Sequence, residues 1–120
     1  MTASPSPQDI VAALLGARFS LAREKETQAE IASEFDRRGI AYDREVDLGG
    51  RNIIDFIVRP NTGIEVKIGG SKRNIYAQCE RYCESKKLSS LILATNVAIG
   101  FPPEIAGIPC FVASLGRAWL

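Results

Sequence analysis

The sequence predicts an α/β domain in which a mixed central sheet is flanked by helices, with the core order α-β-β-β-α-β. Three observations lead to this prediction. The 120 residues suit one compact domain, covering residues 1–120. Three short segments rich in β-branched residues follow one another between residues 40 and 68, separated by turn-forming residues, as in a strand meander. A helical segment then precedes the unbroken apolar run at residues 91–94, which is typical of a strand buried on both faces.

Two helices are expected before the first strand. Residues 9–19 form the shorter one, with its apolar side chains gathered on one side. Ser20 is expected to cap a longer helix over residues 21–38, because a serine hydroxyl can accept a hydrogen bond from the first turn. Gly39 is the expected stop of that helix. The Ser- and Pro-rich residues 1–7 are expected to fray.

Turn signals divide the rest of the chain. Gly49-Gly50 predicts a hairpin, and the Pro-Asn-Thr-Gly sequence at residues 60–63 predicts the next turn. Together with the β-branched and apolar runs, these signals place the remaining elements as follows: strands at 40–48, 52–58 and 64–68, a helix at 74–86, and strands at 89–95 and 108–113.

Composition narrows the chemistry. Hydrophobic residues make up 46% of the chain and the net charge is +1, so the protein reads as globular and carries no overall signal for nucleic acid. It has no histidine, which excludes imidazole catalysis and imidazole metal ligands. The odd number of cysteines (Cys79, Cys83 and Cys110) and the lack of a secretion signal favour free thiols in a reducing cytoplasm. No segment is long and apolar enough for a transmembrane helix, so no membrane partner is expected.

Two carboxylates and a lysine form the main candidate site. Asp55 interrupts the apolar strand at residues 52–58, where an unpaired buried carboxylate would cost several kcal/mol. Glu65 and Lys67 share one face of the next strand, because side chains alternate with period two. The turn at residues 60–63 folds the two strands together. We therefore expect Asp55 beside Glu65, with Lys67 next along.

This arrangement suits phosphodiester hydrolysis. Adjacent carboxylates repel each other, and Mg²⁺, with Mn²⁺ as a substitute, binds such oxygen ligands. Lys67 is placed to contact a phosphate or an attacking water, where its charge would stabilise the transition state. The alternative is a surface strand with a Glu65–Lys67 pair and an Asp55 salt-bridged to an arginine.

Residues 53–55 (Ile-Ile-Asp) and 64–67 (Ile-Glu-Val-Lys) resemble the PD-(D/E)XK nuclease superfamily, whose restriction-endonuclease-like core has the order α-β-β-β-α-β. Ile54 stands where the proline of that motif name would be. Gln78 and Tyr82 are similar to the Gln-x-x-x-Tyr motif of RecB-like members. Residues 42–48 resemble the VRR-NUC and Holliday-junction-resolvase-like branches. The resemblance covers about residues 24–95.

The resemblance implies a role for each matching residue. Asp55, Glu65 and Val66 would be the metal ligands, and Gln78 would orient the groups of the active site. Many relatives also have a glutamate on the first core helix. Here Glu24, Glu26 and Glu30 compete, and Glu24 is favoured because it shares the inward stripe of its helix with Gln28, Ile31 and Phe35.

Nucleic-acid contacts are expected beside this site. Arg51 lies in the predicted hairpin, and Lys72 and Arg73 follow the glycine pair at residues 69–70, at the start of a helix that can receive a phosphate. Tyr82 completes the expected set. Ordinary solvated charge is the alternative for the basic residues, and Trp119 is expected to stack on a base or to pack in a core or a dimer interface.

The sequence thus favours a Mg²⁺-dependent DNA endonuclease, with branched or single-strand-containing DNA as the candidate substrate, a homodimeric state and no small-molecule cofactor. The alternative is a catalytically weak or inactive nuclease-fold module that binds nucleic acid or a replication, repair or packaging partner. An unrelated sugar or nucleotide enzyme has no support, because the chain lacks a phosphate fingerprint such as a P-loop.

Overall fold

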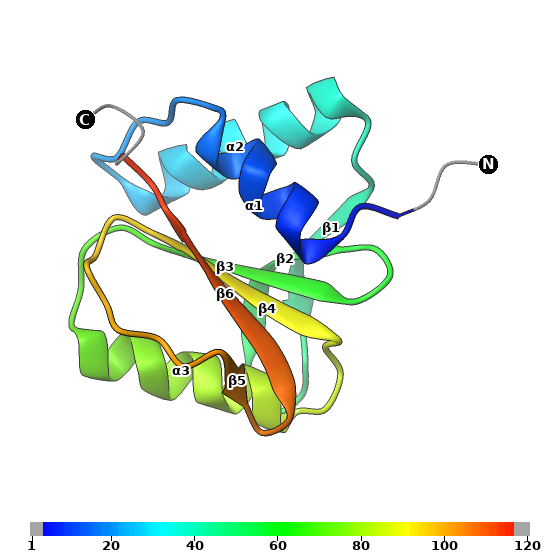
Figure 1. Ribbon diagram of the computed structural model, residues 1–120, viewed down its shortest axis with the longest axis vertical. Coiled ribbons are helices and arrows are strands. Elements are labelled where there is room, and N and C mark those ends of the chain that lie inside the picture. Colours follow the sequence, from blue (N-terminus) through cyan, green and yellow to red (C-terminus); the bar gives the residue numbers. More distant parts are fainter. Residues whose placement is uncertain (1–3, 117–120) are drawn as a thin grey trace.

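The structure, a computed structural model, describes residues 4–116. Helices and strands alternate in the order that the sequence predicts, with one short additional strand near the end (Figure 1). In chain order the elements are α1 (Pro7–Leu15), α2 (Glu24–Arg38), β1 (Tyr42–Asp47), β2 (Ile53–Val58), β3 (Thr62–Lys67), α3 (Lys72–Glu84), β4 (Ser90–Thr95), β5 (Glu104–Ile105) and β6 (Ile108–Ser114).

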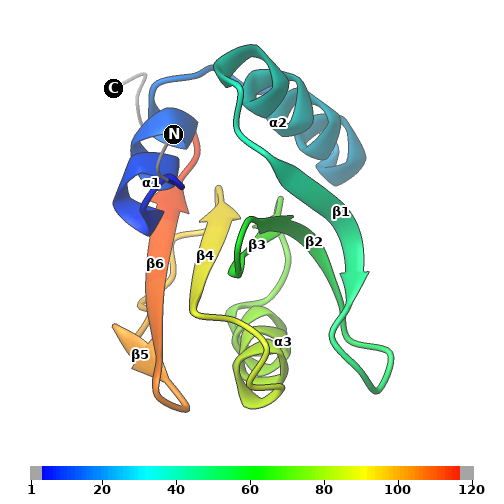
Figure 2. The ribbon, with the colours of Figure 1, turned by 90° about the vertical axis from the view of Figure 1, so that its right-hand side faces the viewer.

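The predicted mixed sheet flanked by helices is confirmed. The strand order is β1-β2-β3-β4-β6-β5. The meander β1–β2–β3 is antiparallel, whereas β4 is parallel to both β3 and β6. Helices α1 and α2 cover one face of the sheet, and α3 covers the other (Figures 1 and 2). Of the helices within residues 4–116, none has the length and apolar character that a membrane crossing requires.

Each face of the sheet carries its own hydrophobic core. The upper core, beneath α1 and α2, consists of Ile10, Leu14, Ile31, Ala32, Phe35, Phe56, Val58, Ile64, Val66, Ile92, Ala94, Ala113 and Leu115. The lower core, against α3, consists of Leu48, Ile54, Ile57, Ile75, Cys79, Tyr82, Cys83, Leu88, Leu91, Leu93, Ile105 and Cys110. The alternating residues of β4 supply both cores, Ile92 and Ala94 the upper one and Leu91 and Leu93 the lower one, which explains the unbroken apolar run in this strand.

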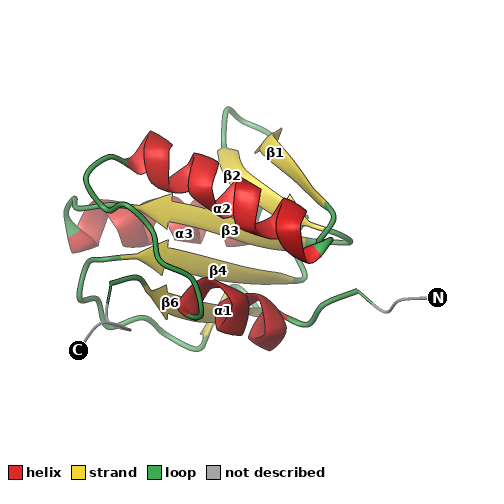
Figure 3. Ribbon diagram, turned by 90° about the horizontal axis from the view of Figure 1, so that it is seen from above, coloured by secondary structure: helices red, strands yellow, loops and turns green. Residues whose placement is uncertain are grey.

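Strands β1 and β2 break the period-two alternation at one shared point. Phe56 belongs to the upper core, but Ile54, two residues earlier, belongs to the lower core. Between them lies Asp55. The residue facing it across the β1–β2 pair is Glu45, which has a left-handed backbone with φ of 51° and drops out of the register. Seen from above, β1 and β2 run diagonally to the other strands (Figure 3).

Helix α1 begins earlier than its sequence pattern predicts. The residues before Asp9 are not all frayed, because Ser6 accepts a hydrogen bond at Oγ from the Asp9 N–H, and its own N–H donates to the Asp9 carboxylate. Pro7 is the first helical residue, a position that tolerates proline because its missing N–H would have no helical partner. The helix ends at Leu15 rather than at residue 19.

Helix α2 begins later than predicted, and Ser20 is not its cap. The helix starts at Glu24, and Arg23 occupies the cap position with an extended backbone. Ser20 instead donates its N–H to Glu30 Oε1 over 2.6 Å, and its carbonyl accepts from Thr27 Oγ1 over 2.5 Å. These contacts fold residues 20–23 against the side of the helix.

Two further differences concern the strands. Thr62 and Gly63 belong to β3 and not to the preceding turn. The short β5 was not predicted, because two residues carry too little pattern, and it pairs with β6 across Ala106 and Gly107, both at positive φ. Trp119 lies outside the described residues.

The position of Gly63 yields a test of this packing. A Cβ at residue 63 would lie 2.6 Å from Ile54 Cδ1 and 2.8 Å from Leu88 Cδ1. Both of those side chains are buried and have little room to move. We expect Gly63→Ala to lower the free energy of unfolding by about 1–3 kcal/mol in urea denaturation.

The matched control for Gly63→Ala is Gly100→Ala, because no atom lies within 4 Å of a Cβ built at residue 100. Adding Ile54→Val to Gly63→Ala removes the nearest clashing atom and should recover part of the loss. Equal stability of Gly63→Ala and wild-type protein would contradict this account.

Candidate active site

The candidate site forms where β2 and β3 separate. Their ladder joins residues 56–58 to residues 62–64 and does not extend to Asp55 and Glu65. Beyond it, side chains replace main-chain acceptors. The Val66 N–H donates to Asp55 Oδ2 over 2.8 Å, and the Asp55 N–H donates to Glu65 Oε1 over 3.3 Å. Each carboxylate thus bonds to the neighbouring strand, which holds Asp55 and Glu65 side by side.

Lys67 completes this group. Its Nζ lies 3.4 Å from Glu65 Oε2. The Glu65 side chain is only 3% exposed, and that of Lys67 is 23% exposed. The structure therefore brings together the three residues that the sequence analysis placed in one site. Asp55 forms its hydrogen bonds with Glu65 and Val66 of β3, and no arginine among the described residues forms an ion pair with it, unlike in the surface-strand alternative.

When both are ionised, the two carboxylates carry more negative charge than Lys67 can balance. Burial, and then the charge of Asp55, raise the pKa of Glu65 to about 8. Burial also raises the pKa of Asp55, with a further contribution from Glu24. Lys67 lowers both pKa values by attraction, but less than burial raises them. A cation placed beside these oxygens would relieve this cost.

Glu24 is the helix glutamate that reaches the site. It is the first residue of α2, and its Oε1 accepts the Ile68 N–H over 3.1 Å. Glu26 and Glu30 instead contact Ser20, with Glu26 also 3.9 Å from Arg23. Glu24 therefore joins the start of α2 to the residue that follows Lys67.

Gln78 and Tyr82 both point from α3 toward the sheet, as their spacing predicts. Gln78 Nε2 donates to the Tyr82 hydroxyl over 2.8 Å, and that hydroxyl donates to the Ile53 carbonyl over 2.9 Å. Gln78 is half-buried. Burial, and then the nearby Glu65 carboxylate, raise the pKa of Tyr82. The predicted contact between Tyr82 and DNA is wrong, because Tyr82 is 0% exposed.

A cleft of about 230 Å³ opens at the end of β3, beside Lys67. The starts of α2 and α3 and the loop between β3 and α3 form its walls, and the following residues line it: Glu24, Lys67, Ile68, Gly69, Gly70, Ser71, Asn74, Ile75 and Gln78. Asp55 and Glu65 do not line the cleft: Glu65 contacts the lining residue Lys67, and Asp55 bonds to Val66, which precedes Lys67 in the chain. The sequence analysis missed Asn74, although it lies four residues before Gln78 on the same side of α3.

The predicted basic contacts lie outside this cleft. Lys72 and Arg73 are exposed in the first turn of α3, beside the cleft-lining Ser71, but neither lines it. Arg51 is exposed in the β1–β2 hairpin with φ of 66°, and it does not line the cleft either. These three residues are positioned for peripheral contacts at most.

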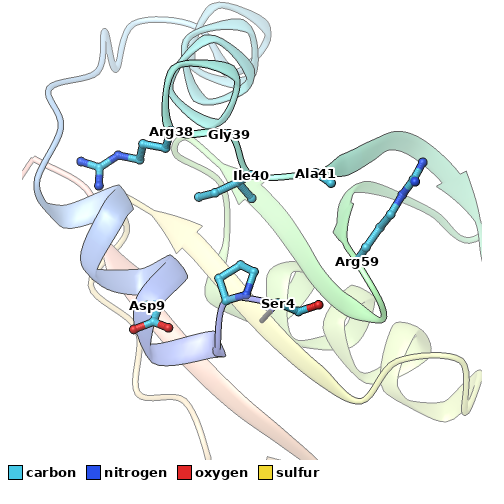
Figure 4. Close-up of a pocket in the computed structure, with 8 residues that line it drawn as sticks. Ser4, Asp9, Arg38, Gly39, Ile40, Ala41 and Arg59 are labelled. Atoms are coloured by element: carbon cyan, nitrogen blue, oxygen red, sulfur yellow. The ribbon is translucent and has the colours of Figure 1, made fainter. Parts of the chain in front are cut away.

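A larger pocket, of about 530 Å³, lies where α2 ends and β1 begins (Figure 4). Arg38 and Arg59 line it on either side, but Arg38 pairs with Glu34 and Arg59 pairs with Asp43. Asp9, also in the lining, is part of the α1 cap. The charged groups of this larger pocket are therefore engaged in structural contacts, and the smaller cleft is the better candidate for an active site.

The donor set fits a hard divalent cation in part. Asp55, Glu65 and the main-chain carbonyl of Val66 offer oxygen ligands, and Mg²⁺ commonly takes one or two carboxylates and completes its shell with water and phosphate. Within residues 4–116, no three His, Cys, Asp or Glu side chains are grouped as a preformed metal centre. A cation here would therefore depend on solvent and substrate for the rest of its ligands.

Comparisons with known proteins do not assign a family. No protein-family model matches the sequence, and neither curated proteins nor solved structures give a significant match.

The buried Tyr82 hydroxyl provides a test of this site's framework. Tyr82→Phe leaves Gln78 Nε2 and the Ile53 carbonyl without their partner, so we expect it to lower the free energy of unfolding by about 1–3 kcal/mol. Denaturant unfolding measures the loss. Tyr76→Phe is the matched control, since Tyr76 lies in the same helix and its ring packs on Phe101. Wild-type stability of Tyr82→Phe would contradict this account of the framework.

Proposed function

We propose that this protein is a Mg²⁺-dependent nuclease that hydrolyses phosphodiester bonds in DNA, related to the PD-(D/E)XK superfamily. The observation that carries the proposal is the pair of carboxylates, half-buried Asp55 and buried Glu65, held together where β2 and β3 separate, with Lys67 3.4 Å from Glu65. Burying two acids beside one base is costly without a further positive charge. A binding surface alone would have no need for that arrangement.

Asp55, Glu65 and the Val66 carbonyl would hold the cation. Oδ2 of Asp55 accepts the Val66 N–H, which leaves Oδ1 as the ligand atom that Asp55 can offer. Mg²⁺, or Mn²⁺ in its place, would supply a Lewis acid that lowers the pKa of water and neutralises charge on a phosphate.

The protein's own groups supply the rest. The Lys67 ammonium, partly exposed in the cleft, would contact a phosphate oxygen and stabilise the charge that develops there. Gln78 and Asn74 line the same cleft and would hydrogen-bond to the substrate or to ordered water. Glu24 would fix the main chain after Lys67 and add negative charge that favours a cation.

DNA would reach the cleft past the exposed cations near its rim. Lys72 and Arg73 follow the glycine loop and would bind backbone phosphates without reading sequence, and Arg51 would contribute from the hairpin. We propose branched or single-strand-containing DNA as the substrate and a homodimer as the working unit. The three cysteines are free and buried, in keeping with a reducing cytoplasm.

One observation favours the alternative of an inactive nuclease-fold module. Both carboxylates already accept main-chain N–H groups, so the site holds its shape without a cation. Such a module would bind DNA or a repair, replication or packaging partner through the same face. Cation binding and DNA cleavage distinguish the two functions.

Cation binding is the first test. Mg²⁺ should raise the melting temperature, because a ligand at a hundredfold excess over its Kd stabilises the folded state by about 2.7 kcal/mol. Asp55→Asn should abolish the shift, since it removes a charge at nearly constant shape. Asp43→Asn, at an exposed aspartate paired with Arg59, is the control and should keep it. A full shift in Asp55→Asn would place the cation elsewhere.

Cleavage is the second test, with single-stranded, duplex, flap and four-way DNA as substrates. Mg²⁺ and Mn²⁺ should support cleavage, whereas Ca²⁺ or excess EDTA should not. Lys67→Ala should reduce the rate by about a hundredfold or more while the Mg²⁺-induced thermal shift persists, because the ammonium acts on the phosphate.

Two further variants calibrate the cleavage test. Gln78→Ala should reduce the cleavage rate by about ten- to a hundredfold, the usual effect of losing a group that orients metal ligands. Arg37→Ala, on the outer side of α2 and paired with Glu34, should leave the rate unchanged. Undiminished cleavage in Lys67→Ala would remove the role given to that lysine, and no cleavage of any substrate would favour the inactive module.

A further inference from the structure

Three consecutive residues at the end of β3 and just after it form main-chain hydrogen bonds with side chains from elsewhere in the chain. The Lys67 carbonyl accepts from Thr95 Oγ1 over 2.6 Å, and the Gly69 N–H donates to Asn96 Oδ1 over 2.8 Å. Between them, the Ile68 N–H donates to Glu24. Three consecutive residues of the cleft wall are therefore each fixed by a side chain from another element.

Thr95 makes the most constrained of these contacts. It is 1% exposed and pairs with Lys67 in the parallel register of β3 and β4. Its hydroxyl donates to Lys67 and accepts the Val97 N–H over 3.0 Å, so both of its hydrogen-bonding roles are used. A hydroxyl with a fixed donor and a fixed acceptor holds the end of β3 in one place.

Asn96 acts on the loop rather than on the strand. It is exposed, and its Oδ1 binds the N–H of Gly69, which has φ of 76° and begins the glycine pair that lines the cleft. Two glycines in succession give the loop wide conformational freedom. The Asn96 contact removes part of that freedom next to Lys67.

We infer that Thr95 and Asn96 are positioning residues, which hold the Lys67 main chain and the Gly69-Gly70 loop in the geometry that the cleft needs. This inference rests on the proposed nuclease function. Neither residue lines the cleft, so both act through Lys67 and the loop rather than by touching substrate. Their loss should therefore lower kcat and leave KM nearly unchanged, because substrate contacts persist while the alignment of the ammonium does not.

Conservative variants separate positioning from bulk packing. Thr95→Val keeps the shape and removes the hydroxyl, whereas Thr95→Ser keeps the hydroxyl. Asn96→Ala removes Oδ1, whereas Asn96→Asp keeps an acceptor at the same place. We expect Thr95→Val and Asn96→Ala to lower kcat by about ten- to a hundredfold, as for other groups that orient an active site. Thr95→Ser and Asn96→Asp should recover most of the rate.

A double-mutant cycle tests whether the effect passes through Lys67. In a Lys67→Ala background, Thr95→Val should lower the residual rate by less than about twofold, since residues that act as one unit are not additive. An effect of full size in that background would overturn the proposed route. So would wild-type kcat in both Thr95→Val and Asn96→Ala.

Amide hydrogen exchange keeps this test independent of cleavage. Asn96→Ala should accelerate exchange of the Gly69 N–H, while exchange of the Val58 N–H, in the buried end of β2, stays unchanged. If the wild-type protein does not cleave DNA, the proposed function fails, and unchanged Gly69 exchange in Asn96→Ala would then overturn the positioning contact as well. Faster exchange with an unchanged kcat would show a structural contact alone and overturn the positioning role. Because Asn96 is exposed, its variants test the inference even if Thr95→Val does not fold.

Discussion

The requirement that every buried main-chain N–H has an acceptor governs this structure. Where β2 and β3 part, the N–H groups of Asp55 and Val66 lose their ladder partners, and carboxylate oxygens take the place of carbonyls. The solution brings two acids into the interior, which raises the pKa of both. The same contacts that satisfy the backbone therefore create a demand for positive charge, and Lys67 meets it only in part.

The two helices that begin at this edge of the sheet turn that local solution into a cleft. Glu24 opens α2 on one face, and Gln78 lies in the middle of α3 on the other. Both reach the end of β3, because the cores on the two faces fix how each helix crosses the sheet. Glu65 is thus buried and Asp55 half-buried, while Lys67 remains in contact with solvent, an arrangement in which electrostatic interactions are strong and substrate can enter.

Much of the fold and part of the site could be predicted from the sequence because short-range rules determine them. Period-two alternation across a tight turn places Asp55 beside Glu65, and helical spacing places Gln78 with Tyr82. The same rules do not reveal how deeply a side chain is buried, so Tyr82 was expected to contact DNA although it is fully buried. Ser20 was expected to cap a helix because nothing in the local pattern reveals its bonds to Glu30 and Thr27. Thr95 and Asn96 escaped notice because the parallel register of β3 and β4 depends on how α3 crosses between them.

The irregularity at Glu45 also affects how the molecule behaves at high concentration. β1 is an edge strand, and four of its six residues are charged: Asp43, Arg44, Glu45 and Asp47. A left-handed residue in its middle interrupts the straight row of N–H and C=O groups that another chain would need for pairing. The irregularity opposite Asp55 thereby protects this edge against strand-to-strand aggregation and disfavours a dimer built by strand pairing through β1.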